Sequence, residues 1–274
     1  MNRYQLPKHD FYHIGYHKTA TKLLKRHVFP QLRPEMDEAG LSLLSRDGLS
    51  GSLFEDDLTA PKEIAAVNPK AKIIICIRSQ YTILRSMYWL YVKSSGHLTY
   101  AEFVKKAIDG QKFFYLDMAD RYAEAFSPDN VLILLYEDLL SDRDRFVQRL
   151  IDFIGIKARA TSIAFPRRPV NPTPSDGYIE FTRHLNHLPY KSSYALTKLG
   201  RAAQYGYLAF EKAHTKTFGR KSRRYDYDAC NELIEQAYTE QNTLLADRYG
   251  LDLARAHYPG TETTPRLLVA RHPG

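Results

Sequence analysis

The chain has 274 residues, 44% hydrophobic and 26% charged, a balance typical of a globular protein with a sizeable core. Its net charge of +8 favours anionic partners, which include nucleotides, acidic glycans, nucleic acid and membrane headgroups. No apolar run approaches the roughly 20 residues that span a bilayer. The first residues lack the apolar core of a signal peptide, and Cys76 and Cys230 are too far apart to suggest a disulfide framework, so we expect a cytoplasmic protein.

The first predicted elements are a short buried strand at 11–14 and a helix that follows it. Gly15 ends the aromatic and β-branched strand, and Thr19 or Thr21 can cap the helix. A strand, a tight turn and a helix N-terminus together present unpaired N–H groups and the positive end of the helix dipole. The sequence therefore predicts an anion site here, to which Lys18 adds a charge.

The following residues predict an interrupted helix and a second strand. Pro30 and Pro34 are expected to break the first helix, with a further turn or two of helix at 33–39. A short strand is expected at 41–44. A glycine-flanked loop follows it and carries Asp47.

The clearest strand is the nearly continuous β-branched run at 72–77, which predicts a strand covered on both faces. Arg78 follows it directly, at the strand end where open α/β sheets place ligand groups. The next helix is predicted at 81–94 and carries Ser86 in its first turns. A guanidinium and a hydroxyl placed in this way suit a terminal phosphate.

The rest of the chain predicts more helices and one more strand. Helices are expected at 99–109, where Thr99 and Glu102 form a partial capping signal, and at 116–126. A buried strand is expected at 131–135. The later predictions are a basic, proline-rich loop at 166–174, a helix at 227–249, and little order from Tyr258 onward. Alternating strands and helices give an α/β fold with a mainly parallel sheet flanked by helices.

The spacing of the first loop excludes one phosphate-binding motif and matches another. A nucleoside-triphosphate P-loop needs four residues between its glycine and a second glycine before the lysine, whereas Gly15 lies only three residues before Lys18. The pattern Gly15-x-x-Lys18-Thr19-x-Thr21 resembles the 5′-phosphosulfate loop of sulfotransferases that use 3′-phosphoadenosine 5′-phosphosulfate (PAPS). Arg78 and Ser86 resemble the 3′-phosphate-binding pair of the same family in residue type, order and spacing.

This resemblance covers residues 11–156 and is closest to bacterial enzymes and to heparan-type carbohydrate sulfotransferases. It implies a single domain over 1–274 with the three-layer, P-loop-NTPase-like sulfotransferase fold. Residues 11–156 would form the nucleotide-binding core. Residues 157–274 would form a mostly helical acceptor side that includes the basic loop.

The resemblance also implies roles for particular residues. Lys18 would stabilise the leaving group, and either Asp47 or His17 would be the base, with Asp47 preferred because it follows a strand end. Glu137 and Asp138 are assigned to structure rather than chemistry. The residues expected to bind the nucleotide are Tyr16, His17, Lys18, Thr19, Ala20, Thr21, Lys22, Arg78 and Ser86, with Arg167, Arg168 and Asn171 from the basic loop.

Two residues depart from the family pattern. Ala20 stands where glycine is common, so we expect this position to avoid a positive φ. Lys22 stands where a small hydroxylated residue is common, and it adds a charge beside the nucleotide.

The function that the resemblance implies is in-line transfer of a sulfuryl group from PAPS, without a metal, to a hydroxyl or amine. The expected acceptor is a carbohydrate or a lipid-linked glycan, and contact with a membrane surface is compatible with the charge. Two other classes stay open. A nucleotide kinase or other NTPase would need the absent Walker spacing. A nucleic-acid-binding protein would explain the charge, but the sequence matches no recognition motif.

Overall fold

The computed structural model describes residues 6–166, 174–187, 205–206, 209 and 227–261, with the backbone alone of Asp47, Tyr227 and Asp228. Its centre is a sheet of four parallel strands in the order β2-β1-β3-β4. The strands are β1 (Phe11–His13), β2 (Leu43–Ser45), β3 (Lys72–Ile77) and β4 (Val131–Leu135). The four predicted strands and the parallel α/β architecture are thereby confirmed.

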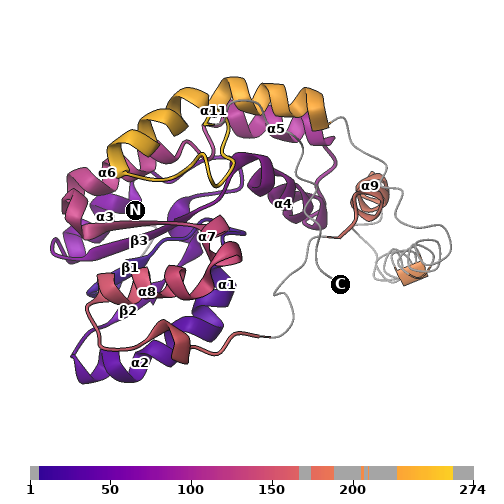
Figure 1. Cartoon of the computed structure of the whole chain (residues 1–274). Coiled ribbons are helices and arrows are strands. Elements are labelled where there is room, and N and C mark those ends of the chain that lie inside the picture. Colours follow the sequence, from indigo (N-terminus) through magenta and orange to yellow (C-terminus); the bar gives the residue numbers. More distant parts are fainter. Residues whose placement is uncertain (1–5, 167–173, 188–204, 207–208, 210–226, 262–274) are drawn as a thin grey trace.

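Helices cover both faces of the sheet and form two separate cores (Figure 1). Ile73, Ile75 and Ile77 of β3 point into one core, whereas Ile74 and Cys76 point into the other, as expected for a strand with both faces buried. The first core contains side chains of α3 (Ala60–Val67), α4 (Gln80–Lys93), α5 (Tyr100–Asp109), α6 (Tyr115–Phe126) and α11 (Tyr227–Tyr249). The second contains side chains of α2 (Phe29–Glu38) and α8 (Arg143–Ile154).

The helical stretch after β1 is continuous, so the predicted interruption at the prolines is wrong. Helix α1 (Thr21–Leu23) passes into a π-helical turn at Leu24–Val28 and then into α2. Pro30 lies at the start of α2, just after the π-helical turn, where the hydrogen-bond ladder already changes register. Pro34 lies inside α2, which continues past it. Burial of Leu32 and Met36 offsets the hydrogen bond that Pro34 removes.

The remaining elements are short, apart from α9 (Asp176–Leu185). The capping box of α5 forms as predicted, with the Thr99 hydroxyl and the Glu102 carboxylate each bonded to the other's backbone N–H. The other short elements are a 3₁₀ turn at Asp47–Ser50, called η2, helix α7 (Tyr136–Ser141), and 3₁₀ turns at Pro128–Asn130 and Ala160–Ser162. None of the helices within the described ranges is both long and apolar enough to cross a bilayer.

Candidate active site

The β1–α1 loop, residues 14–20, is closed by its own hydrogen bonds. The Tyr16 carbonyl accepts from the Thr19 hydroxyl at 2.6 Å, from the Thr21 hydroxyl at 3.1 Å and from the Thr19 N–H at 3.3 Å. A Cβ at Gly15 would lie 2.7 Å from His13 Nε2 and 2.7 Å from Thr21 Oγ1, so a larger residue there would have to displace both buried side chains. The two predicted phosphate-binding hydroxyls thus shape the loop in this structure.

Lys18 and Ala20 both have left-handed backbones, with φ of 69° and 65°. The expectation that Ala20 avoids a positive φ is therefore wrong: the loop needs this conformation, and alanine adopts it at a cost in strain. The predicted threonine cap is wrong too, because α1 is preceded by Ala20, which makes no side-chain cap. Left-handed residues on both sides of Thr19 suit a loop whose N–H groups converge on an anion.

Lys18 is half-buried among other cations. Burial lowers the pKa of Lys18, and the positive charges of Arg78, Lys22 and Lys93 lower it further. No carboxylate among the described residues pairs with Lys18, Lys22 or Arg78. Positive charge without a carboxylate at ion-pair distance among the described residues, beside a helix N-terminus, is the electrostatic setting of an anion site.

Arg78 brings the β3–α4 turn against the β1–α1 loop. Its NH1 group donates to the Lys18 carbonyl at 3.2 Å, and its Nε donates to Thr82 Oγ1 at 2.8 Å. The guanidinium also lies over the Tyr136 ring, 4.4 Å from the ring centre. Since β1 and β3 are paired parallel neighbours, the residues that follow them meet at one sheet edge, and Lys18 and Arg78 each follow one of these strands as predicted.

The β3–α4 turn is fixed by side chains that the sequence did not connect to it. The Ser79 N–H donates to Glu137 Oε1 at 3.0 Å, and the Ser79 hydroxyl donates to the His257 carbonyl at 2.8 Å. The Tyr115 hydroxyl donates to the Arg78 carbonyl at 2.7 Å. The structural role expected for Glu137 agrees with these contacts. Burial raises the pKa of Glu137 to about 6, although the Ser79 hydrogen bond and the Arg78 charge oppose that rise.

Ser86 lies on α4, the helix that starts beside Arg78, and is 3% exposed. Arg85 binds Asp176 of α9 through one NH2 group, at 2.9 Å and 3.0 Å from the two carboxylate oxygens. The helix that carries Ser86 is therefore also the helix on which α9 docks.

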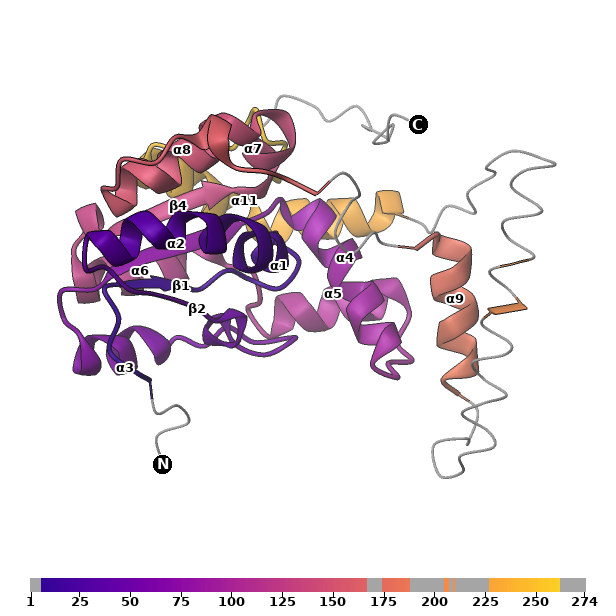
Figure 2. The same cartoon turned by 90° about the horizontal axis from the view of Figure 1, so that it is seen from below.

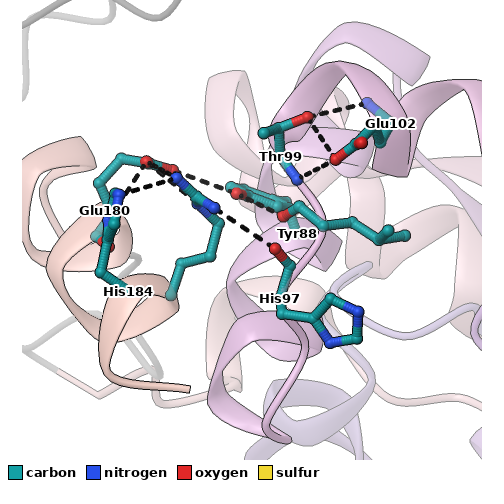
Figure 3. A network of polar contacts seen from close by, with 8 residues as sticks. Tyr88, His97, Thr99, Glu102, Glu180 and His184 are labelled. Atoms are coloured by element: carbon teal, nitrogen blue, oxygen red, sulfur yellow. Dashed lines mark hydrogen bonds and ion pairs between the residues drawn. The ribbon is translucent and has the colours of Figure 1, made fainter. Parts of the chain in front are cut away.

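Helix α9 is held at the end of α4 by a polar network (Figure 3). The Tyr88 hydroxyl lies 3.2 Å from Glu180 Oε1 and 3.0 Å from the Leu98 carbonyl. Arg183 pairs with Glu180 at 2.8 Å and donates to the His97 carbonyl at 3.4 Å. In Figure 2, α9 lies beyond α4 and α5, away from the sheet. These contacts attach α9 to the side of the molecule where α4 ends and α5 begins.

For two of the other predicted site residues, Asp47 and His17, the structure gives the position in the fold. Asp47 begins η2, just after β2, which confirms its predicted position at a strand end. His17 is part of the β1–α1 loop and is half-buried. Arg167, Arg168 and Asn171 lie outside the described residues. No three His, Cys, Asp or Glu side chains of the described ranges gather as a metal site.

Comparisons with known proteins give matches to sulfotransferases. Residues 59–192 match the sulfotransferase domain family, a segment that includes Arg78, Ser86 and Glu137 but begins after Lys18 and Asp47. A sulfotransferase from Alicyclobacillus acidocaldarius is 15% identical, with a TM-score of 0.46 over 61% of this chain and 88% of that chain. Mouse sulfotransferase SULT7A1 complexed with PAP is 14% identical, with a TM-score of 0.45 over 88% of this chain and 86% of that one. No curated protein matches significantly.

Residues 59–192, just under half of the chain, thus match the family that the resemblance of the β1–α1 loop and the Arg78–Ser86 pair had suggested. Its parallel α/β sheet is the architecture that the resemblance implied, and the family match supports sulfuryl transfer as the general reaction.

Proposed function

We propose that the chain transfers a sulfuryl group from PAPS to an acceptor hydroxyl or amine. The observation that supports this most is the approach of two phosphate-binding elements: Arg78 donates to the Lys18 carbonyl, beside a helix N-terminus and without a carboxylate partner among the described residues. PAPS carries phosphate groups at both ends of its ribose. The β1–α1 loop and the β3–α4 turn each bring a cation to the same edge of the sheet, so each could bind one of these phosphate groups.

In this proposal Lys18 and the N–H groups at the start of α1 bind the 5′-phosphosulfate. Arg78 and Ser86 bind the 3′-phosphate. Thr19 and Thr21 hold the loop in shape through the Tyr16 carbonyl, and contact of either hydroxyl with phosphate requires that bond to open. Lys22 adds positive charge beside the 5′-phosphate.

The proposed step is an in-line displacement, by analogy with phosphoryl transfer. The bond from sulfur to the bridging oxygen of the 5′-phosphate breaks as a bond from sulfur to the acceptor forms. The acceptor's proton passes to the base, Asp47 or His17. Lys18 stabilises the charge that develops on the leaving phosphate, a contribution made in the transition state. A carbohydrate or lipid-linked glycan is the proposed acceptor, on the heparan-type resemblance of the sequence.

Ligand-induced thermal shift tests the nucleotide part of the proposal. Adenosine 3′,5′-bisphosphate should raise the melting temperature, because a ligand that binds only the folded chain stabilises it by mass action. Adenosine 5′-phosphate should raise it much less, because it lacks the 3′-phosphate that Arg78 and Ser86 would hold. A larger shift with ATP and Mg²⁺, or with an oligonucleotide, would contradict the proposal. Transfer of radiolabelled sulfate from PAPS to a panel of glycans then tests the acceptor.

A further inference from the structure

A lysine ammonium group is enclosed between the first core and the candidate active site. Lys112 lies in the turn between α5 and α6, and its Nζ is 2.7 Å from Asp56 Oδ1. The two side chains are only 1% and 5% exposed. Burial lowers the pKa of Lys112 and raises that of Asp56, and each partner's charge opposes the shift. A buried ion pair is often no more stable than apolar side chains of the same volume, so stability alone is a weak reason for this pair.

On one side, the pair is joined to the β1–α1 loop. The Tyr16 hydroxyl donates to Asp56 Oδ2 at 2.9 Å, and the carbonyl of the same Tyr16 accepts the hydroxyl hydrogen bonds of Thr19 and Thr21. The Tyr16 ring packs 5.0 Å from the Lys112 ammonium. Asp56 thus fixes the residue around which the loop of Lys18 is built.

On the other side, the same ammonium group holds the segment that follows β2. Lys112 Nζ donates to the Ser50 carbonyl at 2.9 Å and to the Glu55 carbonyl at 3.3 Å. Ser50 ends the η2 turn that Asp47 begins. The segment doubles back tightly at Gly51, which has a φ of 96° and would place a Cβ 2.3 Å from the Glu55 carbonyl oxygen. Lys112 therefore fixes both ends of this short loop.

We propose that Lys112 and Asp56 are positioning residues for sulfuryl transfer, because they hold the loop of Lys18 and the η2 turn of Asp47 in one fixed relation. The inference rests on the proposed function. Neither side chain is placed to touch the nucleotide or the acceptor. A loss of the pair should therefore misalign reacting groups and lower the transfer rate much more than it weakens nucleotide binding.

The gentlest test is Tyr16→Phe, which removes one hydroxyl and leaves the ion pair in place. Tyr122→Phe is the matched control, because it removes a buried hydroxyl with no hydrogen-bond partner among the described residues. The double variant Asp56→Leu/Lys112→Met removes both charges together, which avoids the unpaired buried charge of either single variant. Three quantities are measured: melting temperature, affinity for adenosine 3′,5′-bisphosphate, and the single-turnover transfer rate per nucleotide-binding site.

We expect Tyr16→Phe and the double variant to lose about ten- to a hundred-fold in transfer rate, with nucleotide affinity within about threefold of the natural chain. Tyr122→Phe should match the natural chain in all three measurements. If Tyr16→Phe transfers at the natural rate, the positioning role is wrong. If the rate and nucleotide affinity fall by the same factor, the pair only supports binding and the inference is also wrong. A natural chain that neither binds the bisphosphate nor transfers sulfate would instead overturn the proposed function itself.

Discussion

Ala20 adopts a strained backbone conformation that the β1–α1 loop requires. Its φ of 65° and ψ of 8° are left-handed, a region that costs an alanine about 1–2 kcal/mol. The turn before α1 imposes this conformation, because Leu24 N–H bonds to the Ala20 carbonyl and starts the helix there. Backbone strain is common at functional sites, and here it lies two residues from Lys18.

We expect Ala20→Gly to raise the free energy of unfolding by about 0.5–1 kcal/mol, because relief of strain exceeds the extra entropy of glycine in the unfolded chain. Ala101→Gly is the control: Ala101 is exposed on α5, where glycine should cost about 1 kcal/mol. Denaturant unfolding of both variants measures the difference. Destabilisation of similar size in both would mean that residue 20 is not left-handed in solution.

At the scale of elements, the β3–α4 turn is held by the Glu137 carboxylate, whose burial disfavours its charged form. Glu137 of α7 accepts the Ser79 N–H, and burial raises its pKa from 4.5 to about 6. Between these pH values the folded chain binds a proton that the unfolded chain has released. Stability therefore falls as pH rises through this window, and the cost at higher pH is about 2 kcal/mol.

Glu137→Gln resembles the protonated side chain and should be more stable than the natural chain at pH 8, by about 2 kcal/mol, with the difference fading below the unfolded-state pKa. Glu102→Gln should behave in the opposite way. The Thr99 hydrogen bonds lower the pKa of Glu102, so its charge is stabilising at neutral pH and the amide should cost stability. Thermal unfolding across pH 4 to 8 compares the two variants. Parallel curves for Glu137→Gln and the natural chain would contradict the prediction.

Most elements could be predicted from the sequence because their signals are local. The run at 72–77 is β-branched enough to predict a strand buried on both faces, and Thr99 with Glu102 predicts a helix start. Pro30 was misleading because it lies in the first turn of α2, directly after a π-helical turn where the hydrogen-bond ladder already changes register. The predicted threonine cap of α1 was also wrong because, among the described residues, the hydroxyls of Thr19 and Thr21 donate to the Tyr16 carbonyl and do not accept from the helix N–H groups.

The candidate site was predictable only where its residues follow strands. Lys18 and Arg78 were found because each follows a predicted strand and belongs to a pattern that resembles a phosphate-binding motif, and the pairing of β1 with β3 brings them to one sheet edge. Lys112 and Asp56 gave no such signal, since they lie in turns 56 residues apart and nothing local shows that both are buried. Glu137 was assigned to structure, but its contact with Ser79 could not be foreseen. Contacts of this kind depend on how distant segments pack.

At the scale of the molecule, α11 and the segment after it complete the β3–α4 turn. Gln80 at the start of α4 exchanges amide hydrogen bonds with Asn242 of α11, at 2.9 Å and 3.2 Å. The Tyr258 hydroxyl lies 3.4 Å from Glu137 Oε2, and the Tyr258 side chain is buried. The expectation of little order from Tyr258 onward is therefore wrong for this residue.

Asn242→Ala should lower the free energy of unfolding by about 1–3 kcal/mol, because it leaves the buried Gln80 amide and Pro259 carbonyl short of partners. It should also weaken binding of adenosine 3′,5′-bisphosphate, although Asn242 lies outside the site, because Gln80 is two residues from Arg78. Asn130→Ala is the control, since the Asn130 side chain, among the described residues, donates only to the Phe126 carbonyl at the C-terminal end of α6. Calorimetry gives both affinities. Equal nucleotide affinity in the two variants would show that α11 does not support the site.

The bracing of Arg78 by such late segments has a consequence for the order of events during synthesis. Ser79 is bonded to a residue 178 positions further along the chain, and Gln80 to one 162 positions further. A chain is made from its N-terminus, so β1, Lys18 and β3 leave the ribosome long before Asn242 and His257. Once Leu135 has been made, the nascent chain carries all four described strands, but the turn of Arg78 is complete only after His257 has been added. We therefore expect Arg78 to contribute to nucleotide binding only after synthesis has passed residue 257.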